Sequence, residues 1–215
     1  SQLQALTANQ MATLTNAQLT SLNKSQLKGL TANQFKALTP QQIAELPPAV
    51  FKELVSSKIA YIKPQQLAAL SESQMKMLST SQITELTGEQ LQALNNTQLN
   101  VLTSAQIQRL KSEQVQTLLP TQVATLSNDK LRVALKSLTT EQVQALTPQQ
   151  IAKLAVTDVN SLNPLQLQSL SSVQIAAIDP ELVAQLSRSQ LRGLLPSQVS
   201  ALQRDQLQAL TPPQI

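Results

Sequence analysis

The sequence has no cysteine, no histidine and no tryptophan, and only 1% of its 215 residues are aromatic. Zinc fingers, haem sites and iron–sulfur sites are excluded, because they need imidazole or thiolate ligands. A Ser–His triad and a thiol nucleophile are excluded for the same reason. The 12 acidic residues are scattered along the chain. We therefore expect no catalytic residues, no cofactor and no metal site, and we expect that the protein is not an enzyme.

Long apolar runs and strong charge are also lacking. No apolar run approaches the about 20 residues of a membrane-spanning helix, so we expect no membrane insertion. The net charge of +4 comes from 16 basic and 12 acidic residues spread over the whole length. Such a dilute charge argues against a nucleic-acid partner. The chain opens at Ser1 without a charged and apolar leader, which is the pattern expected of a mature product or an excised segment.

The sequence does contain an octad repeat. An apolar anchor recurs once per octad from Leu6 to Leu126 and again from Leu138 to Leu210, and 24 of these 26 anchors are Leu. The residue five positions after the anchor is apolar in all 26 units, and the residue four positions after it is Gln in 21. The residue directly after the anchor is Ser, Thr, Asn or Asp in 18 units. The consensus octad is therefore Leu, a capping residue, two variable residues, Gln, an apolar residue and two variable residues.

This period does not fit a continuous helix or strand. On an α-helix one octad advances about 800°, so the apolar stripe would slip by about 80° per octad. On a strand, the odd spacings of five and three would place the two apolar columns on opposite faces. A train of short helices fits, because Thr7 can cap a helix whose third residue is Gln10 and form a capping box with it. Leu6 and Met11 then occupy the two positions of a hydrophobic staple.

Proline supports this register independently. Nine of the 11 prolines lie two positions after an anchor, at the first helical position, where the missing N–H has no cost. Helices this short are unstable alone, so neighbouring octads must stack. The sequence therefore predicts an all-α solenoid, or superhelix, of about 26 short capped helices. In the C-terminal part, prolines recur in every second octad from Pro148 to Pro212, a 16-residue super-period, so a hairpin of two octads per coil is a candidate unit there.

Stacking of the octads explains why the residue four positions after the anchor is Gln rather than Glu. Both residues complete a capping box, but a column of carboxylates would repel along a tightly wound solenoid. Gln also donates and accepts hydrogen bonds, so we expect that it can link neighbouring coils.

We expect residues 1–215 to form a single elongated repeat domain with octad blocks at 1–126 and 138–215. Between the blocks the anchor spacing grows from 8 to 12. The four extra residues are about one helical turn, so residues 127–137 are expected to be a four-residue register insertion within one longer helix capped by Ser127. Lys130, Arg132 and Lys136 form a candidate basic interaction face on it. The alternative is a tolerated insertion whose charged side is simply solvated.

A second irregular segment spans residues 46–63, where three capping positions and two Gln positions depart from the consensus. Lysines interleave with aromatic residues there, a combination that suits an anionic or single-stranded partner. The candidate interaction patch consists of Phe51, Lys52, Lys58, Tyr61 and Lys63. Phe51 lies in the apolar column, however, and that position favours the core.

The octads resemble repeats of known families. Residues 38–48 (LTPQQIAELPP) and 62–67 (IKPQQL) resemble the Leu-Ser/Thr-Pro-x-Glu/Gln-Leu units of the mesothelin, stereocilin and otoancorin family. Similar Leu-Thr-x-x-Gln octads occur in large repetitive bacterial surface or secreted proteins. The resemblance covers nearly the whole chain. It implies superhelical arrays of short helices, an extracellular or cell-surface location and a role in adhesion, and it implies no catalytic residues.

The expected function is a non-enzymatic structural spacer or adhesive repeat module of a larger secreted or cell-surface protein. Such a module would bind a protein partner or self-associate along the array. The alternative is a protein- or peptide-binding scaffold, for example an effector-type interaction module, that uses a concave solenoid surface.

Overall fold

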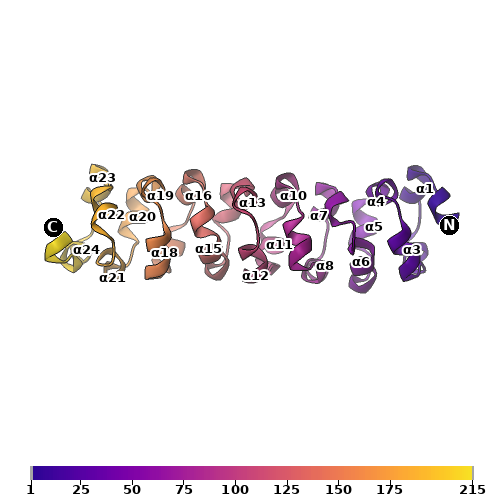
Figure 1. Ribbon diagram of the computed structural model, residues 1–215, viewed down its shortest axis with the longest axis horizontal. Coiled ribbons are helices and arrows are strands. Elements are labelled where there is room, and N and C mark those ends of the chain that lie inside the picture. Colours follow the sequence, from indigo (N-terminus) through magenta and orange to yellow (C-terminus); the bar gives the residue numbers. More distant parts are fainter. Residues whose placement is uncertain (1, 215) are drawn as a thin grey trace. The chain divides into compact units, whose positions relative to one another are not determined.

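The computed structural model describes residues 2–214, and every regular element within them is helical. The chain divides into two compact units, Ser1–Thr117 and Leu118–Ile215, which we describe one at a time. The α-helices are short and follow one another in successive turns within each unit (Figure 1). No helix in this part of the chain has the length and apolarity to cross a bilayer. The prediction of an all-α solenoid of short helices is confirmed.

In the first unit the elements are η1 (Gln2–Ala5), α1 (Ala8–Ala12), α2 (Asn16–Thr20), α3 (Lys24–Gly29), α4 (Ala32–Ala37), α5 (Pro40–Ala44), α6 (Pro48–Val55), η2 (Ile59–Tyr61), α7 (Pro64–Ala68), α8 (Glu72–Met77), α9 (Thr80–Thr84), α10 (Gly88–Ala93), α11 (Asn96–Val101), α12 (Ser104–Gln108) and α13 (Ser112–Thr117), where η denotes a 3-10 helix.

In the second unit they are α14 (Pro120–Val123), α15 (Asn128–Ala134), η3 (Leu135–Ser137), α16 (Thr140–Gln144), α17 (Pro148–Ala152), α18 (Val156–Ser161), α19 (Pro164–Ser169), α20 (Ser172–Ala176), α21 (Pro180–Val183), α22 (Arg188–Arg192), α23 (Pro196–Ser200), α24 (Arg204–Ala209) and η4 (Pro212–Gln214).

The helices begin where the capping argument places them. Thr7 accepts a hydrogen bond from the Gln10 amide at 3.3 Å, and the Gln10 side-chain oxygen accepts one from the Thr7 amide at 2.8 Å. The same reciprocal pair recurs wherever Ser, Thr or Asn caps an α-helix, apart from α15. Where Lys63 or Leu195 takes the capping place, only the bond from its amide to the Gln oxygen remains. Gln therefore defines the helix start even without a capping side chain.

The corners between helices need no special residue. Capping residues are extended, as in Thr31 with φ −71° and ψ 161°, and no residue of the described chain has a positive φ. Left-handed corners favour glycine, so their absence explains how 24 α-helices can be joined in a chain with only three glycines.

Three octads make one regular turn of the solenoid. A helix packs against the helix that begins three octads later, as in α1 with α4 and α7 with α10 in the first unit. In the second unit α16 packs against α19, and α21 against α24, at the same offset. The alternation of prolines therefore does not mark a coil of two octads, and that candidate unit was wrong. Proline occupies the first helical position without setting the number of octads per turn.

The glutamine at the third helical position, which we call the box glutamine, also joins successive turns. The Gln74 oxygen accepts from the Ser71 amide at 2.9 Å, while its Nε2 donates to the carbonyls of Ile43 at 2.7 Å and Leu46 at 3.0 Å. In the second unit Gln174 donates to the carbonyls of Val143 and Leu146 at 3.0 and 2.7 Å. In both cases the acceptors lie 31 and 28 residues earlier, one turn below. The expectation that Gln links neighbouring coils is confirmed.

The apolar anchors and the apolar residues five positions later form the core. Phe35, Ile43, Leu67 and Met75 are fully buried, as are their equivalents through most of both units. Most box glutamines are buried between them. Because each glutamine amide is hydrogen-bonded at both ends there, its burial leaves no polar group unsatisfied.

One turn of the second unit is shorter than the regular ones. Gln142 donates to the Leu118 carbonyl at 2.7 Å and Gln150 to the Leu126 carbonyl at 3.0 Å, and both acceptors lie 24 residues back. The corresponding bond from Gln74 to Leu46 reaches 28 residues back. Helix α15 and η3 take the places that two octad helices occupy in a regular turn. The segment from Leu126 to Leu138 is therefore two octads shortened by one helical turn, rather than one octad lengthened by one.

The first unit has a segment of the same kind at full length. There α6 and η2 lie between the anchors Leu46 and Ile62, which are two octads apart. The irregular capping positions of residues 46–63 therefore mark a place where one longer α-helix and a 3-10 helix replace two standard helices.

Candidate interaction surfaces

The first predicted patch is divided between the interior and the surface. Phe51 is fully buried in α6, and Lys58 is buried with 6% of its surface exposed. Neither side chain can contact a partner in this structure, so both assignments to a binding patch are corrected. Lys52, Tyr61 and Lys63 are exposed.

Lys58 is buried because it replaces a box glutamine. Its ammonium donates to the carbonyl of Lys28, 30 residues earlier, at 2.6 Å, which is the same connection to the turn below that a glutamine makes. Burial lowers the pKa of Lys58 below its ordinary value, and the positive charge of Lys28 lowers it further. Its role is a structural bridge in the ladder of box side chains.

Tyr61 is ordered at the surface by a neighbour from the turn below. The Lys36 ammonium of α4 lies 5.5 Å from the centroid of the Tyr61 ring in η2. Such a cation–π contact contributes about 0.5 to 1 kcal/mol at an exposed site. The half-exposed ring and its cation form a small amphipathic platform.

Acidic groups balance part of the positive charge in this region. Glu53 on α6 lies 2.8 Å from the Lys24 ammonium and 3.7 Å from that of Lys28. The hydrogen bond from Lys24 is the main reason that the pKa of Glu53 is lowered. The single carboxylate of Glu53 therefore offsets one of the two positive charges of Lys24 and Lys28.

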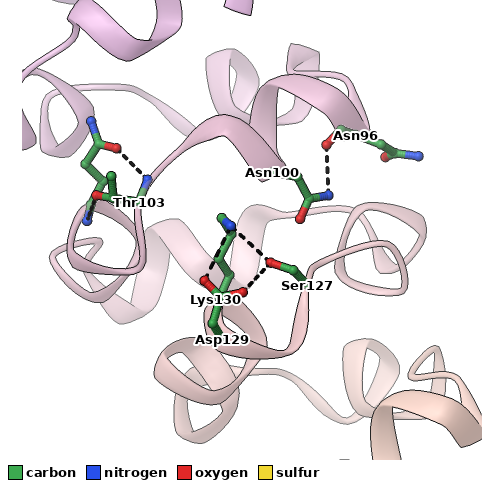
Figure 2. Close-up of polar contacts among 7 residues, drawn as sticks. Asn96, Asn100, Thr103, Ser127, Asp129 and Lys130 are labelled. Atoms are coloured by element: carbon green, nitrogen blue, oxygen red, sulfur yellow. Dashed lines mark hydrogen bonds and ion pairs between the residues drawn. The ribbon is translucent and has the colours of Figure 1, made fainter.

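The second predicted face, Lys130, Arg132 and Lys136, does not form one basic surface. Lys130 is buried, and Figure 2 shows its ammonium joined to the Ser127 hydroxyl at 3.0 Å and to Asp129 at 3.5 Å. The Ser127 hydroxyl donates to Asp129, so Ser127 is the N-cap residue but makes no capping bond to the helix amides.

Arg132 is paired as well. Its Nε lies 2.7 Å from the carboxylate of Asp158, which stands at a box position and is buried. The same carboxylate oxygen accepts from the Ala155 amide at 2.7 Å, so Asp158 keeps the capping function and Arg132 compensates its charge. Of the three predicted residues, Lys136 is the one whose charge is both exposed and without a nearby acid in the described chain.

The sequence did not indicate an open hollow in the first unit. It has a volume of about 450 Å³ and is lined by Thr80, Ser81, Thr84, Arg109 and Lys111. Helices α9 and α12 stack one turn apart and bring these residues together. Two cations and three hydroxyls suit a weakly held anion but supply no general base. Within residues 2–214 no three acidic side chains are grouped as a metal site.

Two exposed apolar side chains stand out in the second unit. Leu165 on α19 is 67% exposed and Val173 on α20 is 65% exposed. Both lie three positions after an anchor, where the repeat usually has polar or small residues. Since that position carries no structural role in the octad, the sequence pattern gave no reason to single them out.

No protein-family model matches the chain, and no curated protein matches it.

Proposed function

We propose that the chain is a non-enzymatic structural spacer or adhesive repeat module of a larger secreted or cell-surface protein. The observation that carries the proposal is the ladder of box glutamines, which joins successive turns within each unit by bonds such as those of Gln74 and Gln174. A chain that commits its most regular polar residue to linking turns is suited to spanning distance. The surface location rests on the resemblance to secreted and cell-surface repeats.

Small-angle scattering tests the spacer role. An extended spacer should give a radius of gyration well above the about 17 Å of a globular chain of this length. A value near the globular one would contradict the proposal. Measurement over a range of concentrations separates the shape of one chain from association.

A protein- or peptide-binding scaffold is the second candidate, and the Tyr61 platform favours it. If a partner binds there, Tyr61→Ala should weaken its capture from an extracellular extract, whereas the exposed control Gln116→Ala should not. Far-UV circular dichroism should show equal helicity for both variants. Equal capture by the two variants would remove this surface from consideration.

A further inference from the structure

Two open hollows of the first unit adjoin each other, and Ser81 of α9 lines both of them. The larger is the hollow of about 450 Å³ between α9 and α12, which is within the size range of ligand pockets. The smaller has a volume of about 250 Å³ and reaches α6 through Lys52. Because the two hollows share a side chain, one ligand made of two linked groups can occupy both.

The larger hollow is positively charged and can donate hydrogen bonds. Arg109 and Lys111 are exposed, and within residues 2–214 neither forms an ion pair, whereas Arg132 does. The Thr80 hydroxyl makes no hydrogen bond with another described residue, so it can donate as well. No carboxylate of the described chain lines this hollow. A guanidinium, an ammonium and a hydroxyl around one space suit a single oxyanion.

The smaller hollow is balanced in charge and offers both donors and acceptors. Lys52 brings one positive charge and Glu85 one negative charge, and neither forms an ion pair in the part of the chain that the structure describes. Met77, which is 39% exposed, adds an apolar face. A neutral sugar matches this lining, because its hydroxyls both donate and accept hydrogen bonds and one side of its ring is apolar.

We propose that the two hollows bind an acidic glycan, with the sulfate or carboxylate of one sugar in the larger hollow and a neighbouring neutral sugar in the smaller one. Among the described residues no aromatic side chain lines either hollow, so nucleic-acid bases have no ring on which to stack. A peptide would need a sheet edge or apolar pockets, and Met77 alone provides neither. The inference rests on the two hollows and does not depend on the proposed role as a spacer.

The ligand class is tested by titrating the full chain with small probes in a buffer free of phosphate and sulfate. Sulfated lactose and sialyllactose each carry one anion on a neutral sugar, whereas lactose lacks the anion and inorganic sulfate lacks the sugar. Heteronuclear NMR should show saturable shifts in α9 and α12 with at least one acidic sugar, at a Kd at least about tenfold lower than for lactose or sulfate. The acidic sugar that binds more tightly identifies the anion as sulfate or carboxylate. Failure of both acidic sugars to bind more tightly than sulfate would overturn the proposal, and so would equally tight binding of a tripeptide that contains phosphoserine.

The two cations of the larger hollow are tested with Arg109→Gln combined with Lys111→Gln. This double variant should bind the acidic sugar at least about tenfold more weakly, with unchanged circular dichroism and thermal unfolding. Lys63→Gln combined with Lys76→Gln is the matched control, because both lysines are exposed, line neither hollow and remove the same net charge. Equal weakening by the two double variants would show attraction by the overall charge of the chain and would overturn the assigned site.

The junction of the two hollows is tested with Ser81→Leu, which fills the place where they meet. This variant should bind the acidic sugar at least about fivefold more weakly, while its Kd for inorganic sulfate stays nearly unchanged. Ser73→Leu is the matched control, since both serines are exposed and directly precede a box glutamine, but Ser73 lines neither hollow. Unaltered binding of the acidic sugar by Ser81→Leu, or equal weakening by Ser73→Leu, would overturn a site that spans both hollows.

Discussion

At the scale of single residues, the box glutamine performs two functions with the two ends of one amide. Its oxygen holds the start of its own helix and its nitrogen holds the turn below. The first function was predictable from the spacing of Thr or Ser and Gln. The second was predictable in kind, because an amide both donates and accepts. Its acceptors were not predictable, since they depend on the number of octads per turn.

Replacing a buried box glutamine with glutamate separates these functions. Gln74→Glu should keep the capping bond but lose the two hydrogen bonds that Nε2 donates to the carbonyls of Ile43 and Leu46. It should also bury a negative charge against these carbonyls. We expect the free energy of unfolding to fall by about 3 kcal/mol or more. Urea unfolding measures this difference. Gln116→Glu, on the exposed side of α13, should change stability by less than about 0.5 kcal/mol. Equal effects would contradict the role of the ladder.

The buried lysine predicts a pH effect of known sign. Because the pKa of Lys58 is lowered in the folded protein, the unfolded chain binds its proton more tightly. The free energy of unfolding should therefore rise as the pH increases through the lowered pKa, up to the ordinary value near 10.5. Lys58→Met removes this contribution. The free energy of unfolding of the wild type should therefore increase relative to that of the variant as the pH is raised from neutral to about 10.

Lys52→Met serves as the control for this titration, because its side chain is exposed on the same helical segment that precedes Lys58. A Lys58→Met difference that stays flat with pH, or that follows the Lys52→Met difference, would show that the charge of Lys58 is not buried.

At the scale of the elements, the octad pattern predicts where helices start far better than it predicts the structure of the irregular segments. Nearly all helix positions followed from capping residues, Gln and proline. Residues 127–137 were placed in a longer helix, and α15 with η3 occupies them. The sequence could not predict that these two elements replace two octad helices. That result depends on which carbonyls accept from Gln142 and Gln150 in the turn below. Likewise, Lys58 looks like a surface residue from its type alone, and only its bond to the Lys28 carbonyl in the turn below shows that its position is interior.

Two glycines allow a matched test of helix packing. A Cβ at Gly88 would lie 2.7 Å from Cγ2 of Thr117 on α13, one turn above, whereas nothing lies within 4 Å of a Cβ at Gly29. Gly88→Ala should lower the free energy of unfolding by about 1 to 3 kcal/mol. Gly29→Ala should raise it by about 0.5 to 1 kcal/mol, because alanine favours the helix.

The cause of the Gly88→Ala effect can be checked in a double variant. Thr117→Ser removes Cγ2, so it should recover most of the loss in thermal or urea unfolding. Failure of Thr117→Ser to recover stability would indicate a different cause, such as an altered start of α10.

At the scale of the whole molecule, stability should vary along the array. Most apolar residues five positions after an anchor are buried in the second unit, whereas Val199 is 48% exposed and Leu207 is 46% exposed. We expect native-state hydrogen exchange to give the lowest opening free energies in α22, α23 and α24 and higher values in α16 and α17. Uniform protection across these helices would show that the second unit opens only as a whole.

The short turn of the second unit has a mechanical consequence. If a chain end is pulled, the ladder should release the turns of a unit one after another, because successive turns within a unit are held together by their own side-chain bonds. A regular turn of three octads would release about 80 Å of extended chain, whereas the turn between Leu118 and Leu138 would release only about 70 Å. A stretching trace would therefore consist of nearly equal steps, with one shorter step that marks this turn.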